Sequence, residues 1–336
     1  MRLRSRLIRL LRLTDRELHD RCVTGTLAAD VAGVDEPIVI DVDPDATSWE
    51  PTALEFLARL PCLVVSGPRG PEATAHLDAV AEPGVVALDR LVDAIDAHPD
   101  AALALALLQR GSDRRSVADG LVAESATYSL LQSGPEFAAW RAGRPPRSRP
   151  APARADGPLV VARDGTRLSV TLHRPEVHNA LDVTMRDALL ETLSVAVADP
   201  TVAVVELRGA GATFCSGGDL DEFGSAPDPV AAHRIRLAAS IGGLIDRLRD
   251  RVVVFVHGAC RGSGVELPAF AGTVVADPDA TFALPEVAMG LIPGAGGTVS
   301  IARRVGRLRT TTWALSGAVI DASTALEWGL IDAVEV

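Results

Sequence analysis

Lysine is absent from this sequence of 336 residues, and all 33 basic residues are arginine. The absence excludes Schiff-base chemistry through a lysine and a lysine clamp on phosphate groups. The bias toward arginine is explained more simply by genome composition than by function. Because 44 acidic residues give a net charge of −11, the chain is not expected to bind nucleic acid in general.

Cysteine is scarce, and its four positions fit neither a metal site nor a disulfide framework. We therefore expect free thiols in a reducing compartment, and no bound metal. Cys215 and Cys260 fall inside glycine motifs, so each is either a nucleophile or a small residue that fills a tight turn. Neither cysteine has a histidine and a carboxylate in a triad pattern, which favours the second interpretation.

No apolar run reaches the ~18 residues that a membrane helix needs. Residues 1–21 mix leucine with arginine and lack an uninterrupted apolar region, so they do not resemble a secretory signal. We expect this segment to form a basic helix on its own protein or a partner subunit, in preference to a membrane surface. A cytoplasmic protein without a membrane partner is therefore expected.

Residues 142–158 are dense in proline and arginine and cannot form a regular element, which predicts an extended linker. The linker separates residues 1–141 from residues 159–336. With 336 residues, the chain is long enough for two domains or one large one. Its 48% of hydrophobic residues can form a sizeable core.

The part after the linker predicts strands alternating with helices, and hence a largely parallel sheet with helical cover. Asp164-Gly165 is a hairpin turn signal, and Asp182 is a plausible helix N-cap. The expected strands are 159–162, 167–172, 202–207, 252–256, 273–276 and 281–283. The expected helices are 182–197, 230–248, a short one after Gly264, 297–305 and 310–316.

The part before the linker predicts a small α/β unit without an obvious catalytic set. Its expected strands are 37–42, 62–66 and 84–88, between helix-like stretches. Helices are expected at 101–109 and 116–131, the second with Ser116 as its N-cap.

Two glycine turns after the linker each follow a buried strand, one at 214–220 and one at 256–267. N–H groups in such turns and at helix starts are unsatisfied and carry the positive end of the helix dipole. Two of them from separate turns can form an oxyanion hole for a carbonyl or thioester oxygen.

Glu266 lies in the second turn, and Glu286 follows a proline twenty residues later. If they face each other across a ligand, they can hold a water, and like charges in a dry site raise one carboxyl pKa. Each glutamate alone would be explained as a helix cap. The pair together with the glycine turns, including the one at 293–297, favours an enzyme.

These motifs resemble the crotonase superfamily, the enoyl-CoA hydratase/isomerase proteins, over residues 159–336. The resemblance implies an α/β, crotonase-like fold of ββα repeats, preceded here by an N-terminal α/β and helical region. The matching segments are Arg174-Pro175-Glu176-Val177-His178-Asn179-Ala180-Leu181, Phe214-Cys215-Ser216-Gly217-Gly218-Asp219-Leu220, Gly262-Ser263-Gly264-Val265-Glu266-Leu267, Leu284-Pro285-Glu286-Val287, the run 292–298, and glycine turns at 315–318 and 327–332.

The resemblance also implies roles for individual residues. The oxyanion donors would be the backbone N–H groups of Gly218 and Ser263, where serine replaces the usual glycine. Glu286 would exchange the α-carbon proton, and Glu266 would orient the water. The expected substrate and CoA contacts are Asn179, Ala180, Leu181, Gly217, Asp219, Leu220, Gly262, Gly264 and Arg261. Arg261 departs from the family's smaller residue, and could contact a phosphate or charged acyl group or point to solvent.

The end of the chain also departs from the family, whose members continue into C-terminal helices that cover the site and build trimers. The run 116–141 resembles that ending, although it precedes the other motifs. One hypothesis is that residues of about 90–141 form a displaced helical cap, in cis or on a neighbour. The α/β piece before them would then be the remnant of a degenerate second copy. An unrelated N-terminal domain is the alternative, and the sequence does not decide between them.

The function that the resemblance implies is an enoyl-CoA hydratase-like lyase of fatty acid metabolism, acting on an acyl-CoA through an enolate. The alternatives are an isomerase, decarboxylase or thioester hydrolase of the same superfamily, and a non-catalytic acyl-CoA-binding subunit. No cofactor is expected beyond the coenzyme A of the substrate, and the resemblance implies a homotrimer or hexamer.

Overall fold

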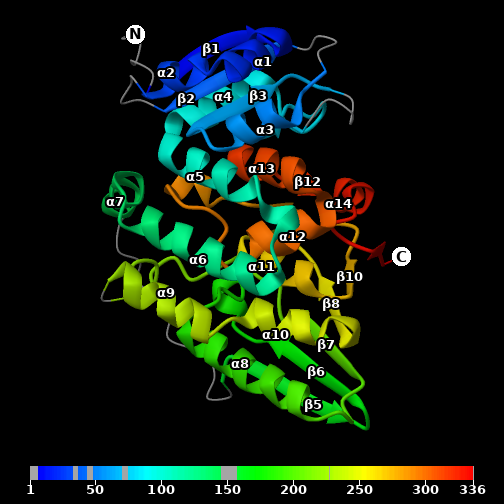
Figure 1. The fold of residues 1–336 in the computed structure, drawn as a ribbon. Helices are drawn as coiled ribbons and strands as arrows, with labels where there is room; N and C mark the ends of the chain where they lie inside the picture. Colours follow the sequence, from blue (N-terminus) through cyan, green and yellow to red (C-terminus); the bar gives the residue numbers. More distant parts are fainter. Residues whose placement is uncertain are drawn as a thin grey trace.

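The computed structural model describes residues 7–32, 37–43, 48–69, 75–144, 157–226 and 228–335. An N-terminal α/β unit occupies one end of the molecule, and a β-hairpin with a long helix occupies the other (Figure 1). The linker predicted at 142–158 falls largely on residues 145–156, which lie outside the described residues.

The N-terminal unit is built on a four-stranded sheet in the order β1-β2-β3-β4, with every pairing parallel. The central strands carry almost continuous apolar runs, as expected of a parallel sheet covered on both faces. Its elements are β1 (Arg9–Thr14), α1 (Asp15–Thr24), α2 (Thr26–Ala32), β2 (Ile38–Asp43), α3 (Pro51–Ala58), β3 (Cys62–Ser66), β4 (Ala79–Val80) and α4 (Leu88–Ala97).

Two predictions for this unit are wrong in part or in full. Within the segment 1–21, expected to form a basic helix, Arg9–Thr14 instead forms β1, which pairs with β2 from Arg9 opposite Ile38 onward. Residues 15–21 are helical in α1, and residues 1–6 lie outside the described residues. The pairing with a buried neighbouring strand overrides the local helical pattern. The strand expected at 84–88 is a turn, because Gly84 has a φ of 81° and Glu82 bridges Val86.

The C-terminal part contains a six-stranded sheet in the order β13-β10-β8-β7-β6-β5 and a three-stranded sheet in the order β12-β11-β9. The large sheet is parallel except for the β5–β6 hairpin. The strands of the two sheets are β5 (Leu159–Asp164), β6 (Arg167–Leu172), β7 (Val204–Gly209), β8 (Val252–Val256), β9 (Ala259–Arg261), β10 (Thr273–Ala276), β11 (Thr281–Ala283), β12 (Ile320–Asp321) and β13 (Ala333–Val334).

The helices of this part follow the strands in repeated ββα units. In β8-β9-α11, the first strand joins the large sheet and the second joins the small one, and β10 and β11 repeat this arrangement. The helices are α8 (Val183–Ala198), α9 (Pro229–Ala238), α10 (Ile241–Arg247), α11 (Ser263–Glu266), α12 (Gly297–Val305), α13 (Arg307–Ser316) and α14 (Ala322–Trp328). The ββα fold predicted from the motifs is therefore present.

Most predicted elements of this part are confirmed, including the N-cap of α8, where the Asp182 carboxylate accepts the Met185 N–H at 2.9 Å. The single helix expected over 230–248 is wrong. The chain breaks after α9, and the Ser240 hydroxyl caps a new helix, α10, by accepting the Gly243 N–H at 3.1 Å.

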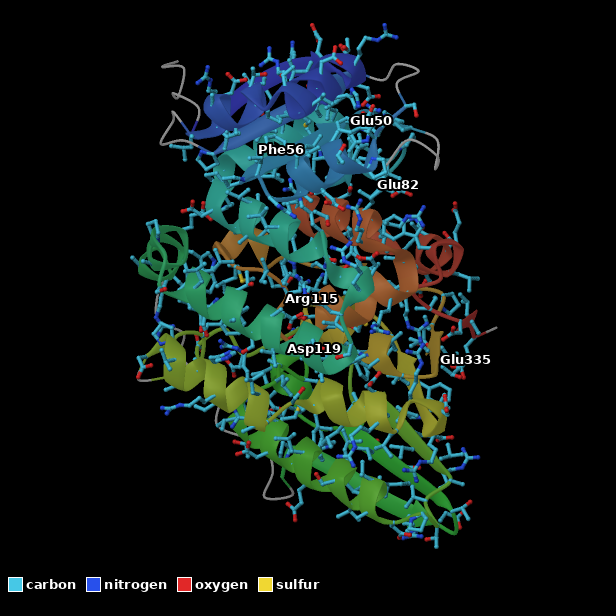
Figure 2. The ribbon with its side chains drawn as sticks, viewed as in Figure 1. Glu50, Phe56, Glu82, Arg115, Asp119 and Glu335 are labelled. Carbon is cyan, nitrogen blue, oxygen red and sulfur yellow. The ribbon has the colours of Figure 1, made fainter. Side chains whose placement is uncertain are left out.

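Three helices, α5 (Pro99–Gln109), α6 (Val117–Gln132) and α7 (Pro135–Ala142), lie between the two sheet-bearing parts. Ser116 caps α6 by accepting the Asp119 N–H at 3.1 Å, as predicted, and Asp119 is labelled there in Figure 2. α6 packs against α9, α10 and α12 of the C-terminal part (Figure 1). Gly120 permits this approach, because a Cβ there would lie 2.7 Å from Val299 of α12.

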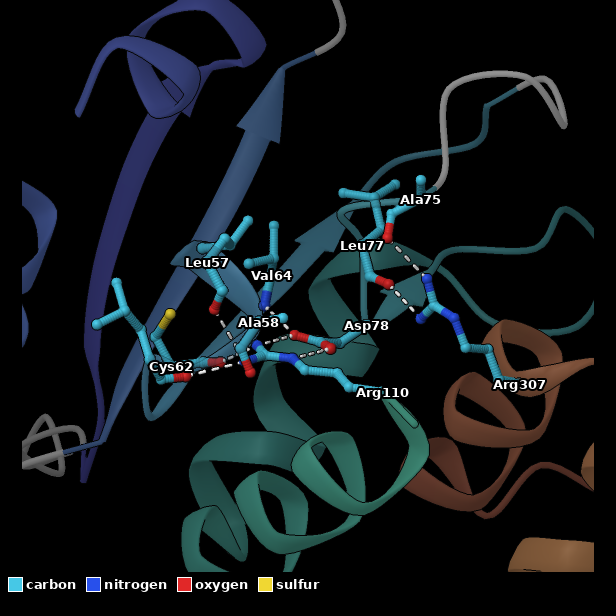
Figure 3. A network of polar contacts seen from close by, with 10 residues as sticks. Leu57, Ala58, Cys62, Val64, Ala75, Leu77, Asp78, Arg110 and Arg307 are labelled. Atoms are coloured by element: carbon cyan, nitrogen blue, oxygen red, sulfur yellow. Dashed lines mark hydrogen bonds and ion pairs between the residues drawn. The ribbon is translucent and has the colours of Figure 1, made fainter. Parts of the chain in front are cut away.

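Arginines of the neighbouring helices form hydrogen bonds and ion pairs with the N-terminal α/β unit (Figure 3). Arg110, at the end of α5, donates to both carboxylate oxygens of Asp78, at 2.8 and 2.6 Å. Arg307 of α13 donates to the carbonyls of Leu77 and Ala75. Arg309 of α13 pairs with Glu82, which lies at the boundary between the two parts (Figure 2).

One buried apolar cluster extends across both parts of the chain, from Val39 and Leu63 through Leu105 to Phe270 and Ile292. Burial of such a shared core favours a fixed arrangement of the parts. Within the described segments, every helix is too short or too polar to span a lipid bilayer.

Candidate active site

A cavity of ≈ 530 Å³ lies where the two glycine turns meet α6 and α9. Glu266 and Glu286 both line it, as do Gly218 and Ser263. Four groups that the sequence singled out are thus brought to one space, although their positions span almost seventy residues.

The two glycine turns come together because glycine lets their backbones touch. A Cβ on Gly264 would lie 2.1 Å from the Cys215 carbonyl oxygen, which leaves no room for a side chain. Gly217 has a φ of 101°, and the Arg261 N–H donates to the Cys215 carbonyl at 3.2 Å. The close approach therefore requires glycine at these positions.

The N–H groups of Gly218 and Ser263 are available to a ligand. Leu181 pairs with both neighbours of Gly218, donating to the Gly217 carbonyl and accepting from the Asp219 N–H. Because successive residues of an extended chain point their N–H groups to opposite sides, the Gly218 N–H faces away from Leu181. Ser263 begins α11, where an N–H lacks an intrahelical acceptor. Neither N–H has an acceptor among the described residues.

Glu266 is buried, and one of its oxygens is fixed. Its Oε2 accepts the N–H groups of Ala295 at 2.8 Å and Gly297 at 2.9 Å, so Glu266 does cap the start of α12. Its Oε1 has no partner in the described part of the chain and is left for a ligand or water. Burial raises the pKa of Glu266 to about 7, against the opposing effect of the two amides.

Glu286 has the opposite character. Its side chain is 7% exposed, and its Oε2 is buried without a hydrogen-bond partner among the described residues. Burial, and then the charge of Glu266, raise the pKa of Glu286 well above its ordinary value. A buried carboxyl with one oxygen that receives no hydrogen bond is most stable with its proton on, which suits a general acid.

A third glutamate, Glu124 of α6, belongs to the same network and was missed from the sequence. Its oxygens accept the N–H groups of Gly296 and Thr298, at 2.7 and 2.9 Å, and the Thr298 hydroxyl at 2.6 Å. Burial, and then the charge of Glu266, raise its pKa to about 8. No local motif marked Glu124, because its partners lie more than 170 residues away in the sequence.

Three further residues of the cavity wall were also missed: Tyr128 and Gln132 of α6 and Arg236 of α9. Arg236 lies 4.7 Å from the Tyr128 ring centroid and donates to the Gln132 side-chain oxygen. The predicted helix 116–131 contains Tyr128, but a helical pattern alone does not indicate which residues face a cavity formed with distant segments.

Several predicted contact residues shape the site without lining this cavity. Asn179 is fully buried, and its Nδ2 donates to the carbonyls of Ala210, Thr213 and Phe214. Arg261 folds back on β11, donating to the carbonyl and hydroxyl of Thr281. The residues in this group are Asn179, Ala180, Gly217, Leu220, Gly262, Gly264 and Arg261, whereas Leu181 and Asp219 do line the cavity.

The cysteines of the turns do not have the environment of nucleophiles. Burial raises the pKa of the Cys215 thiol to about 11 and that of Cys260 to about 12, so both are thiols at neutral pH. The described residues contain no group of three or more histidine, cysteine or acidic side chains arranged to hold a metal ion.

Comparison with known proteins shows which family shares the sequence of the C-terminal part. The sequence profile of the family Enoyl-CoA hydratase/isomerase matches residues 164–335. The 2,3-dehydroadipyl-CoA hydratase of Escherichia coli K12 is 33% identical over 176 residues, which are 52% of this chain and 68% of that protein. The 1,2-epoxyphenylacetyl-CoA isomerase of the same organism is 34% identical over 169 residues, which are 49% of this chain and 64% of that protein.

A solved structure shows the same fold. The enoyl-CoA hydratase of Mycobacterium smegmatis superimposes with a TM-score of 0.50 and 31% identity, over 53% of this chain and 70% of that one. The profile covers more than half of the chain, and the ββα architecture agrees with it. The chain therefore belongs to the enoyl-CoA hydratase/isomerase family, the crotonase superfamily.

Proposed function

We propose that the protein is an enoyl-CoA hydratase, which adds water to a 2-enoyl-CoA thioester or removes it from the hydrated product. The observation that carries the proposal is the contrast between the two glutamates of the cavity. Glu286 has an unpartnered buried oxygen and a pKa raised well above its ordinary value, whereas Glu266 is held by two amides. One carboxyl can therefore give a proton while the other takes one.

In hydration, the N–H groups of Gly218 and Ser263 would receive the thioester oxygen and stabilise the negative charge that develops on it. Each such donor contributes about 2.7–4 kcal/mol to transition-state stabilisation. Glu266 Oε1 would take a proton from water as the water oxygen bonds to the β-carbon. Glu286 would give its proton to the α-carbon, so that the elements of one water molecule are added across the double bond. Loss of the proton from Glu266 to solvent and uptake of one by Glu286 would then restore both groups.

Substitution of each glutamate by glutamine tests this division of work. We expect Glu266→Gln and Glu286→Gln each to lower kcat for crotonyl-CoA by at least about a hundredfold, the contribution typical of general acid–base catalysis. Binding of the thioester should be retained, because the N–H donors are unchanged. Spectrophotometric turnover and calorimetric binding measure the two effects separately.

The matched control is Glu191→Gln, the same substitution at an exposed position of α8. It should turn over like the wild-type protein. Wild-type turnover in both cavity variants would show that neither glutamate moves a proton, and the proposal would then be wrong. Acyl-CoA binding without any turnover in the wild-type protein would instead indicate a non-catalytic binding subunit.

Double-bond isomerisation is the second candidate, because it needs only one carboxyl to move a proton between two carbons. Glu286 alone has a buried carboxyl oxygen without a partner among the described residues, and one relative is named an isomerase. For an isomerase, a 3-enoyl-CoA substrate should still react in Glu266→Gln but not in Glu286→Gln.

A further inference from the structure

One wall of the cavity, formed by α6 and α9, presents hydrogen-bond donors without acceptors. Tyr128 is the only tyrosine in the chain. Its side chain is 7% exposed and lines the cavity, and its hydroxyl has no hydrogen-bond partner in the described part of the chain. A hydroxyl that lines a cavity and has no protein partner can donate to a ligand or water in that cavity.

Arg236 places a positive charge in the same wall. Its guanidinium donates only to neutral oxygens, those of Ser125, Ser129 and Gln132. No carboxylate of the described residues forms an ion pair with it. Burial lowers its pKa from the ordinary value, which indicates a charged group removed from water without compensation from a directly paired acid.

Three acids of the surroundings, Glu124, Glu222 and Asp219, are held by groups other than Arg236. The charge of Glu124 acts on the pKa of Arg236. Both oxygens of Glu124, however, accept hydrogen bonds from the N–H groups of Gly296 and Thr298. Glu222 and Asp219 also line the cavity. Glu222 accepts the Val183 N–H, and Asp219 lies 3.7 Å from Arg174. The charge of Arg236 is therefore not matched by contact with any of these three.

Gln132 adds a second kind of free donor. Its Oε1 accepts from Arg236 Nη1 at 3.2 Å, which directs its amide nitrogen elsewhere. The amide N–H groups have no acceptor among the described side chains and carbonyls. Tyr128 and Gln132 are four residues apart on α6 and so lie on the same face of the helix.

We propose that Tyr128, Gln132 and Arg236 form a subsite for an acyl chain that carries a carboxylate at its far end. A carboxylate would provide acceptor oxygens for the Tyr128 hydroxyl and the Gln132 amide nitrogen. It would also provide a negative charge to pair with the guanidinium of Arg236. This inference rests on the proposed function in one respect, because it takes the ligand to be an acyl-CoA. An anionic group could also come from the phosphates of coenzyme A, and the test distinguishes the two sources.

Calorimetric binding of saturated thioesters to the full-length protein tests the subsite without requiring turnover. Glutaryl-CoA and valeryl-CoA have acyl chains of equal carbon number that end in a carboxylate and a methyl group, respectively. Adipyl-CoA and hexanoyl-CoA form the same pair one carbon longer. The carboxylated member of at least one pair should bind about tenfold to a hundredfold more tightly, the range of a hydrogen bond to a charged group.

Three variants locate the effect. Arg236→Gln and Tyr128→Phe should each weaken binding of the carboxylated thioester by about tenfold, and Gln132→Met by somewhat less, while valeryl-CoA binding changes less than about threefold. Tyr128→Phe removes only a hydroxyl, so it remains informative if Arg236→Gln loosens the contact between α6 and α9. Thr127→Val is the control, because the Thr127 hydroxyl bonds only to the Ala123 carbonyl of its own helix.

Equal affinity within both pairs would overturn the subsite while leaving the proposed function intact. Equal weakening of both members of a pair by Arg236→Gln would assign the guanidinium to a coenzyme A phosphate, and would also overturn the proposal. Failure of every acyl-CoA to bind would overturn both the subsite and the proposed function.

Discussion

Glu124 and Glu266 accept alternate N–H groups of one turn. Glu266 takes those of Ala295 and Gly297, and Glu124 takes those of Gly296 and Thr298. The turn leads into α12, whose first N–H groups have no acceptors within the helix. A glutamate from the N-terminal part and one from the 262–267 turn thus fix the same four residues beside the cavity.

This arrangement places three buried carboxyl groups in one network, since Glu286 lies on the same cavity. The charge of Glu266 raises the pKa of both Glu124 and Glu286. Like charges this close in a dry site cannot all ionise, so the three groups titrate as a coupled set. Glu124 therefore affects both the stability and the protonation of the site without lining its main cavity.

Stability should fall as the pH rises from about 4.5 to about 8. Carboxyl groups in the unfolded chain have pKa values near 4.3, whereas those of Glu266 and Glu124 are raised to about 7 and about 8 in the folded protein. Between these values the folded state binds more protons, so the free energy of unfolding decreases with pH, by at most about 1.4 kcal/mol per unit for each group. Chemical denaturation at a series of pH values measures the slope.

The variant Glu124→Gln isolates one of these groups. It removes a titrating carboxyl, so the loss of stability between pH 5 and pH 8 should be smaller than in the wild-type protein. Glu191→Gln on the surface of α8 should keep the wild-type slope. An unchanged slope in Glu124→Gln would show that Glu124 stays ionised throughout this pH range.

The rate of hydration should have a bell-shaped pH dependence. Glu266 must be ionised to take a proton from water, so kcat/KM should rise as the pH passes about 7, to which burial raises its pKa. Glu286 must be protonated, and its pKa is raised further by burial and by Glu266, so the rate should fall at higher pH. Activity that peaks below pH 6 and declines through neutrality would contradict these assignments.

The parts of the site that could be predicted from the sequence are those encoded by short contiguous motifs. The glycines of the 214–220 and 262–267 turns have local signatures, and so does the Asp182 cap. The break between α9 and α10 also had a local signal in Ser240, which caps α10, although one continuous helix was expected over 230–248. Local sequence patterns therefore predict that an element is present more reliably than they predict the residues at which it begins and ends.

The cavity wall could not be predicted, because its chemistry depends on contacts between distant segments. Glu124 and Tyr128 lie on a helix whose sequence indicates only that it is amphipathic or buried. Their roles depend on Gly120 and Val299, which set how closely α6 approaches α12. Arg9–Thr14 became a strand for a similar reason, since its partner β2 is almost thirty residues away.

Gly262→Ala should lower the rate of the proposed hydration strongly. An added Cβ would lie 2.4 Å from Glu286 Oε1, and Gly262 has a φ of 48°. Displacement of the general acid by about 1 Å can cost on the order of a hundredfold in rate, which steady-state kinetics would measure. Gly165→Ala is the matched control, with a φ of 56° and no atom near the new Cβ. Gly165→Ala should lose roughly 1–2 kcal/mol of stability from backbone strain. Gly262→Ala should lose more, because its ψ of −119° lies outside the left-handed region. Equal activities of the two variants would show that Glu286 tolerates the displacement.

Cleavage between residues 145 and 156 tests whether the N-terminal helices belong to the catalytic unit. With a protease site inserted there, the cut chain should elute as one particle and keep its activity, because α6 packs on α9, α10 and α12. Residues 157–336 expressed alone should fold poorly or lack activity. Without Glu124, the N–H groups of Gly296 and Thr298 lose their acceptors, at about 1–3 kcal/mol for each group left buried. If the isolated fragment folds and turns over substrate like the whole protein, the helices around α6 are an independent domain and not a cap.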